Sequence, residues 1–257
     1  MTDDALQADA LAARLVAARR HGPGRFEAAL VPADAAAAMR VQHDVARRLG
    51  AQVGGWKVGF SPDGVPFAGP LYEDGIVRSP ATRPLAAGDH VLVEVELAFR
   101  LARDLPSRET PRDEIVAAID SALVGIELIR GRLGEPPALP FLAFLADNAG
   151  NDGYVTGGST REFRRLDLTR LRCRLSVGGK LVHDKVGGHP QGDPIEPIRA
   201  WLARADGTLG GLRAGHVVTT GSFTTPFRAE DAARFEASMA GIGEVRLDLA
   251  RSAARKA

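Results

Sequence analysis

The sequence predicts an α+β fold with a strand-rich core, and two observations support this prediction. Segments in which apolar residues alternate strictly with other residues occur in clusters and hairpins. Segments with helical periodicity lie between these clusters and do not follow every strand, as they would in a doubly wound sheet. No repeat, low-complexity tract or clear linker interrupts the chain. We therefore expect a single domain over residues 1–257, with a helical part at 1–50 and a strand-rich core at 51–257.

Composition limits the classes of function that need to be considered. The chain has 45% hydrophobic and 25% charged residues, as ordinary globular proteins do. Its 33 Lys and Arg nearly balance its 32 Asp and Glu, which argues against a nucleic-acid or membrane-surface partner. The single cysteine excludes an intrachain disulfide and fits a reducing compartment. Because neither a secretory signal nor a membrane-spanning run is found, we expect a cytoplasmic protein.

The first 60 residues predict two helices and a short strand. Apolar residues at helical spacing indicate a first helix that ends near His21. A second helix begins after Asp34, a typical N-cap residue, and ends at Leu49 before Gly50. The apolar run from Gly54 to Gly59 then predicts a strand. Lys57 lies inside this run, either as an exposed residue of a half-buried strand or as a functional cation.

The segment from Phe60 to Tyr72 is rich in Pro, Gly and Asp, which predicts a loop that could act as a lid. A long strand from Asp89 to Leu101 follows, because every second residue from Val91 onward is apolar. Glu94 and Glu96 are two apart, so their carboxylates project side by side from the other face. Two carboxylates this close repel each other, and the repulsion must be relieved by water, a base, a raised pKa or a cation. A simply solvated face remains the alternative.

A third glutamate changes the balance between these alternatives. Glu127 lies in an apolar run from Leu123 to Ile129 that is typical of a buried strand. A lone carboxylate there is costly unless it is paired or binds a metal ion. Glu94, Glu96 and Glu127 are therefore candidate oxygen ligands for a hard divalent cation.

The second half of the chain predicts further strands and one helix. Asp147 and Asn148 end an apolar stretch, where capping is the ordinary role of such residues. Residues 161–174 alternate arginine with leucine, and we interpret them as a solvated strand face. A hairpin turns at Gly178–Gly179, and a helix begins at 192–194. A strand from His216 to Thr220 ends in Gly221 and Ser222, and residues 235–249 form a closing hairpin.

Several short motifs occur in a fixed order along the chain. They are Gly55-Trp-Lys-Val-Gly59, Val93-Glu-Val-Glu-Leu-Ala-Phe99 with Arg103-Asp-Leu-Pro106, Gly125-Ile-Glu127, Leu145-Ala-Asp-Asn-Ala149, Gly188-His-Pro190, Thr219-Thr-Gly221 and Gly241-Ile-Gly243. In this order they resemble the 2-keto-4-pentenoate hydratase and 4-oxalocrotonate decarboxylase group of the fumarylacetoacetate hydrolase superfamily.

This resemblance implies the family's strand-rich roll and a centre for Mg²⁺ or Mn²⁺ held by Glu94, Glu96 and Glu127. It implies that Lys57 is the catalytic residue near the metal. Substrate-binding positions are expected at Lys57, Leu71, Asp147 and Ser222. Members of the family are cytoplasmic and usually oligomeric, so we expect a homo-oligomer. Its small-molecule partner is expected to be a 2-oxo acid substrate.

The implied reaction is addition of water to a 2-hydroxy-2,4-dienoate, giving a 4-hydroxy-2-oxo acid in aromatic-compound degradation. Two alternatives remain: decarboxylation of a 2-oxo acid, and a non-catalytic oligomeric partner subunit of the same fold. Two departures from the family bear on the substrate. The family often has aspartate in the segment that reads Pro66-Phe67-Ala68-Gly69 here, and many members have serine at the position of Gly150.

Overall fold

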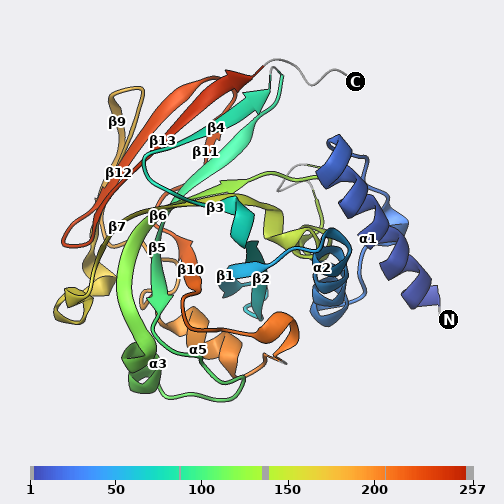
Figure 1. The fold of residues 1–257 in the computed structure, drawn as a ribbon, viewed down its shortest axis with the longest axis horizontal. Helices are drawn as coiled ribbons and strands as arrows, with labels where there is room; N and C mark the ends of the chain where they lie inside the picture. Colours follow the sequence, from blue (N-terminus) through green and yellow to red (C-terminus); the bar gives the residue numbers. More distant parts are fainter. Residues whose placement is uncertain (1–2, 87, 135–138, 206, 253–257) are drawn as a thin grey trace.

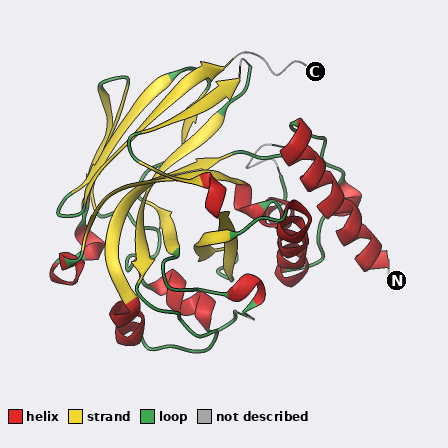
Figure 2. Ribbon diagram, in the orientation of Figure 1, coloured by secondary structure: helices red, strands yellow, loops and turns green. Residues whose placement is uncertain are grey.

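The computed structural model describes residues 3–86, 88–134, 139–205 and 207–252. Two β-sheets form a curled body, and a pair of N-terminal helices packs against one side of it (Figure 1). Figure 2 shows the strands gathered into one body, with the two long N-terminal helices beside it on the right. The strand-rich α+β prediction is confirmed. The α-helices are α1 (Asp3–His21), α2 (Ala35–Leu49), α3 (Arg112–Ala118), α4 (Phe141–Ala146) and α5 (Glu196–Leu202).

The larger sheet contains the strands on which the candidate site residues lie. In spatial order its strands are β2 (Pro66–Tyr72), β1 (Val53–Phe60), β10 (Val217–Ser222), β5 (Val91–Leu101), β6 (Ile119–Ile129), β7 (Asn151–Thr160) and β3 (Ile76–Arg78), with β11 (Phe227–Ala229) beside β5. The second sheet runs β4 (Ala81–Ala86), β13 (Gly243–Ser252), β12 (Ala233–Met239), β8 (Arg172–Val177) and β9 (Lys180–Val186).

The main apolar core lies on one face of the larger sheet. Val93, Val95 and Leu97 of β5 are fully buried there, as their alternation predicts. Glycines let the two sheets approach closely, since a Cβ atom on Gly157 would lie 2.5 Å from the carbonyl oxygen of Glu244. The opposite face of β5 carries Glu94 and Glu96, so the core fixes the direction of both carboxylates.

The two N-terminal helices form a second apolar cluster with the larger sheet. Helix α2 begins at its predicted cap, where the Asp34 carboxylate accepts a hydrogen bond of 2.7 Å from the Ala37 N–H. It ends at Gly50, whose φ of 65° is left-handed. The inner sides of α1 and α2 pack on Phe67 and Ala149, which brings the helices close to β2 and to the segment after α4. Among the described residues, no helix is long and apolar enough to cross a membrane.

The predicted loop from Phe60 to Tyr72 is wrong over most of its length. Residues Pro66–Tyr72 form strand β2, which pairs antiparallel with β1 and has a largely buried interior. The loop was predicted because proline and glycine weaken the central strands of a sheet. Strand β2, however, lies at the edge of its sheet. At an edge, a proline does not remove a ladder hydrogen bond that the sheet needs.

Two further local predictions are wrong. Residues 161–174 are not one strand face: they form the 3₁₀ turns Glu162–Arg165 and Leu168–Arg170 before β8 begins. Asp167 starts the second turn by accepting the Thr169 N–H, and Phe163 is buried, so the leucine and arginine pattern reflects turns that pack on the core. The helix predicted at 192–194 begins at Glu196 instead, after Asp193 accepts the Ile195 N–H.

Candidate metal centre

Strand register brings the three predicted glutamates together. Glu94 of β5 lies directly opposite Glu127 of β6, and Glu96 follows two residues along the same face. One carboxylate oxygen from each residue can be chosen so that all three lie within 4.8 Å of one another. Glu96 is 2% exposed and Glu127 is fully buried, whereas Glu94 is partly exposed. Three hard oxygen donors at this separation form a set that fits a divalent cation.

Glu127 is held by two donors from separate strands. The ammonium nitrogen of Lys57, on β1, lies 2.9 Å from each carboxylate oxygen of Glu127. Lys57 also donates to the carbonyl oxygen of Ala149 at 3.2 Å. The side-chain amide of Asn151 donates to Oε1 of Glu127 at 2.8 Å. The buried carboxylate is therefore paired and hydrogen-bonded, and its orientation is fixed.

Glu96 is held by a hydroxyl group from a third strand. Thr219 on β10 donates its hydroxyl to Oε2 of Glu96. Tyr154 on β7 in turn donates to Oγ1 of Thr219 at 3.4 Å. The phenol fits beneath the glutamates only because residue 125 is glycine, since a Cβ atom there would lie 2.2 Å from the Tyr154 hydroxyl oxygen.

Burial and mutual repulsion dominate the electrostatics of this cluster. Burial, together with the charges of Glu127 and Glu94, raises the pKa of Glu96 well above its usual value. Burial and Glu127 raise the pKa of Glu94 to about 7, although Lys57 opposes that shift. For Lys57, burial alone would lower the pKa, but the three carboxylates outweigh it and raise the pKa. Ionisation of all three glutamates would give the cluster more negative charge than one lysine can balance, so the metal-free cluster favours bound protons, and a divalent cation could replace them.

The pKa of Glu94 predicts a pH dependence for both stability and metal binding. Because the folded-state pKa lies above the ordinary value of 4.5, the protonated form stabilises the metal-free protein. That contribution is complete below pH 4.5 and is lost as the pH rises through about 7. Divalent cations must displace this proton, so their affinity should rise by up to about tenfold per pH unit below 7.

Isothermal titration of Mn²⁺ into the metal-free protein at pH 5.5, 6.5 and 8.0, with urea unfolding at each pH, checks this prediction. Glu236→Gln is a matched control, because Glu236 lies exposed on β12 and its loss should leave the pH profile unchanged. An affinity that stays constant from pH 5.5 to 8.0 would contradict the expected coupling.

The remaining predicted site residues are engaged in other contacts. Leu71 is 1% exposed and packs against Tyr154, Ala98 and Val217 on the same face of the sheet. Ser222 pairs in register with Glu96, and its hydroxyl donates to the Thr224 carbonyl oxygen at 2.8 Å. A substrate-binding role for either residue remains a prediction.

Asp147 is held by an arginine instead of capping a helix with its side chain. Its carboxylate accepts the backbone N–H of Arg132 at 2.8 Å and the guanidinium at 3.0 Å. Both groups are almost fully buried. This pair anchors the segment that places the Ala149 carbonyl against Lys57, while direct contact between Asp147 and a substrate remains a prediction.

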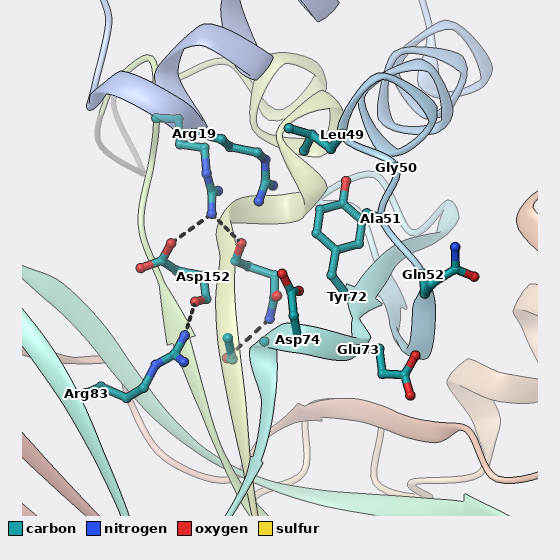
Figure 3. A pocket seen from close by; sticks show the side chains of 14 residues that line it. Arg19, Leu49, Gly50, Ala51, Gln52, Tyr72, Glu73, Asp74, Arg83 and Asp152 are labelled. Carbon is teal, nitrogen blue, oxygen red and sulfur yellow. Dashed lines mark hydrogen bonds and ion pairs between the residues drawn. The ribbon is translucent and has the colours of Figure 1, made fainter.

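A cavity of about 750 Å³ lies between the N-terminal helices and β7, and Asn151 forms part of its wall. Figure 3 shows Arg83 and Asp152 meeting on one side of it, where the guanidinium donates to the Asp152 carbonyl oxygen at 3.2 Å. Three arginines and three carboxylates line the cavity, so its charges offset one another. Because Asn151 also bonds Glu127, the cavity adjoins the glutamate cluster without including a glutamate of that cluster in its lining.

Sequence reasoning missed the residues that orient the glutamates. Thr219, Tyr154 and Asn151 each come from a strand distant in the sequence from the glutamate that it orients or supports. The pairing of β10 and β7 with the glutamate strands decides these contacts, and single-sequence patterns do not specify it. The one available signal was Thr219 itself, a polar residue that directly follows two valines in the predicted strand.

Comparison with known proteins gives a family match over most of the chain. Residues 72–250 match the family model described as fumarylacetoacetate (FAA) hydrolase C-terminal. The 2-keto-4-pentenoate hydratase of Paraburkholderia xenovorans (strain LB400) is 30% identical over 209 residues, covering 78% of this chain and 77% of the relative. The 2-hydroxyhexa-2,4-dienoate hydratase of Comamonas testosteroni is 29% identical over 173 residues, covering 67% of this chain and 64% of the relative.

Among solved structures, 4-oxalocrotonate decarboxylase from Pseudomonas putida G7, complexed with magnesium and adipate, superimposes with a TM-score of 0.82. It is 23% identical in sequence, and the match covers 97% of this chain and 99% of that one. At this identity the likeness establishes the fold. With the family model spanning most of the strand-rich part, the chain belongs to the fumarylacetoacetate (FAA) hydrolase C-terminal family.

Proposed function

We propose that this protein is a divalent-metal-dependent hydratase, a lyase that adds water to a 2-hydroxy-2,4-dienoate to give a 4-hydroxy-2-oxo acid. Such a reaction belongs to the degradation of aromatic compounds. The observation that carries the proposal is the convergence of carboxylate oxygens of Glu94, Glu96 and Glu127 within 4.8 Å of one another, beside the largely buried Lys57. The hydratases related to this chain, at about 30% identity, support the choice of reaction.

Charge balance supports Mg²⁺ or Mn²⁺ as the cofactor. Three ionised glutamates and one protonated lysine leave a deficit of positive charge, and one divalent cation would neutralise it. Glu94, Glu96 and Glu127 would hold the ion through hard oxygen atoms. When bound, it would supply Lewis-acid polarisation of the oxygen at C2 of the substrate.

Lys57 would bind the anionic substrate. The raised pKa keeps its amine protonated at neutral pH, so it offers positive charge and an N–H donor beside the carboxylates. Its side chain is 12% exposed and is held by Glu127 and by the Ala149 carbonyl oxygen. These contacts limit its movement, and an oriented ammonium group can attract the substrate carboxylate and exclude misplaced binding modes.

The other predicted positions would act through shape and support. Leu71 would contribute to the apolar floor beneath the cluster, together with Tyr154. We propose that Asp147 positions the segment after α4 through its pair with Arg132, and that Ser222 shapes the turn opposite Glu96.

Two positions where the family often has polar residues form apolar contacts in this chain. Phe67 packs edge-on against Phe141, with ring centroids 5.4 Å apart. Gly150 has a φ of 72°, and a Cβ atom there would lie 2.6 Å from the Phe144 ring. A serine would therefore not fit at residue 150 without local rearrangement.

The direct test follows the absorbance of 2-hydroxypenta-2,4-dienoate after enzyme is added, with Mg²⁺, with Mn²⁺ and with a chelator. We expect metal-dependent loss of the dienoate absorbance and formation of a 4-hydroxy-2-oxo acid, identified by mass spectrometry. Release of CO₂ from an oxalocrotonate would assign the decarboxylase reaction instead. Metal binding without turnover of any 2-hydroxydienoate would favour the non-catalytic subunit.

A further inference from the structure

The contacts of the two buried glutamates limit how many oxygens each can offer to a cation. Oε2 of Glu96 accepts the Thr219 hydroxyl, which engages one of its two lone pairs, so Oε1 is the less engaged oxygen. Both oxygens of Glu127 are close to donors, Oε1 to Asn151 and both to Lys57. In each of these two carboxylates a donor therefore competes with an ion for at least one oxygen, which disfavours ligation through both oxygens at once.

Thr219 is placed to impose this limit rigidly. It is fully buried and lies between Lys57 on one neighbouring strand and Ala98 on the other. Its χ1 freedom is small because its side chain is β-branched. Its hydroxyl accepts from Tyr154, which favours donation of its own hydrogen to Glu96. Tyr154 is 1% exposed and is fixed by the space that Gly125 leaves, so the whole chain of hydroxyl groups has little room to reorient.

Single-oxygen ligation has a consequence for the choice of ion. Ca²⁺ takes six to eight oxygens in flexible geometry and commonly uses both oxygens of a carboxylate. Mg²⁺ requires near-octahedral geometry with short bonds, which single-oxygen carboxylates and water satisfy. A site whose two buried carboxylates favour ligation through one oxygen therefore favours the smaller, six-coordinate ions.

We propose that Thr219 is a specificity-determining positioning residue, whose hydroxyl restricts Glu96 to one-oxygen ligation and thereby makes the centre prefer Mg²⁺ and Mn²⁺ over Ca²⁺. The inference rests on the proposed metal centre and adds to it a residue that does not itself touch the ion. Tyr154 supports Thr219 in this role by fixing the direction of its hydroxyl.

The experiment compares the dissociation constants of Mg²⁺, Mn²⁺ and Ca²⁺ by isothermal titration into metal-free protein. In Thr219→Val, Oε2 of Glu96 becomes free to bind the ion, and the preference for Mg²⁺ over Ca²⁺ should fall by about tenfold, the value of a hydrogen bond to a charged group. Thr219→Ser retains the hydroxyl and should keep the wild-type ratio. Tyr154→Phe should shift the ratio in the same direction as valine, by a smaller factor.

Thr220→Val is the matched control. Thr220 is the next residue on β10 and is equally buried, but its hydroxyl contacts His189 on the other side of the strand. The ratio of Mg²⁺ affinity to Ca²⁺ affinity in Thr220→Val should equal that of the wild-type protein. Circular dichroism and thermal unfolding confirm that each variant is folded, and Tyr154→Phe provides the test if Thr219→Val does not fold.

The possible results separate this inference from the proposed function. If the wild-type protein binds none of the three ions, the metal centre itself is refuted. If wild-type binds them and Thr219→Val changes all three affinities by the same factor, Thr219 has only a structural role and the inference is overturned. A lowered Mg²⁺ preference in Thr219→Val that Thr219→Ser does not reproduce supports it.

Discussion

Replacing Glu96 by glutamine is expected to weaken Mn²⁺ binding by at least ~100-fold while the protein remains folded. Glutamine offers one neutral oxygen where the carboxylate offers a charged one, and the hydroxyl of Thr219 can still donate to it. The metal-free variant should be more stable than wild-type at pH 8, because the substitution removes a buried negative charge beside Glu94 and Glu127. Isothermal titration and urea unfolding measure the two effects.

The opposite directions of these effects make the test specific. A substitution that merely damages the fold would lower stability and metal affinity together. The exposed Glu236→Gln control should change neither quantity. Wild-type Mn²⁺ affinity in Glu96→Gln would remove Glu96 from the metal centre and, with it, the proposed enzyme.

Replacing Lys57 by methionine is expected to lower turnover strongly while metal binding is retained or strengthened. Methionine fills similar space but removes the charge that balances Glu127. Breaking a buried ion pair in this way should lower the free energy of unfolding of the metal-free protein by about 3 kcal/mol at pH 8. A divalent cation would find a more negative site, so Mn²⁺ should bind at least as tightly and restore part of the stability.

Steady-state kinetics and Mn²⁺ titration separate the two roles of Lys57. We expect kcat/KM to fall by at least ~100-fold, because the substrate carboxylate loses its positive partner. Lys180→Met is the matched control, since Lys180 is exposed at the start of β9 and should be neutral in both assays. Turnover close to wild-type in Lys57→Met would show that the lysine has only a structural role.

Much of the candidate centre could be predicted from the sequence because the two-residue period of a strand is visible in the order of its apolar residues. Alternation along Val91–Leu101 placed Glu94 and Glu96 on one face, and the structure confirms that the other face forms the core. The apolar setting of Glu127 predicted a buried carboxylate that needs a partner, and the structure supplies Lys57 and Asn151. In both cases a local rule, the two-residue period or the cost of burying charge, decided the outcome.

Predictions were wrong where an element's position in the sheet decides its conformation. The composition of residues Pro66–Tyr72 predicts a loop, yet these residues pair with β1 as an edge strand. Proline and glycine are tolerated at such an edge. Residues 161–174 read as a strand, yet buried side chains such as Phe163 hold two turns against the core. Local propensity was overridden by packing in both segments.

The sequence by itself determined which face of β5 carries the carboxylates, where helix α2 begins and ends, and that three glutamates offer hard oxygen atoms as candidate ligands. These properties follow from the side-chain period of a strand, from capping by Asp34 and Gly50, and from the chemistry of oxygen ligands. Only the tertiary structure decided that Thr219, Tyr154 and Asn151 meet the glutamates. Their positions depend on the register between strands distant in the chain, and register is fixed by packing of the whole sheet.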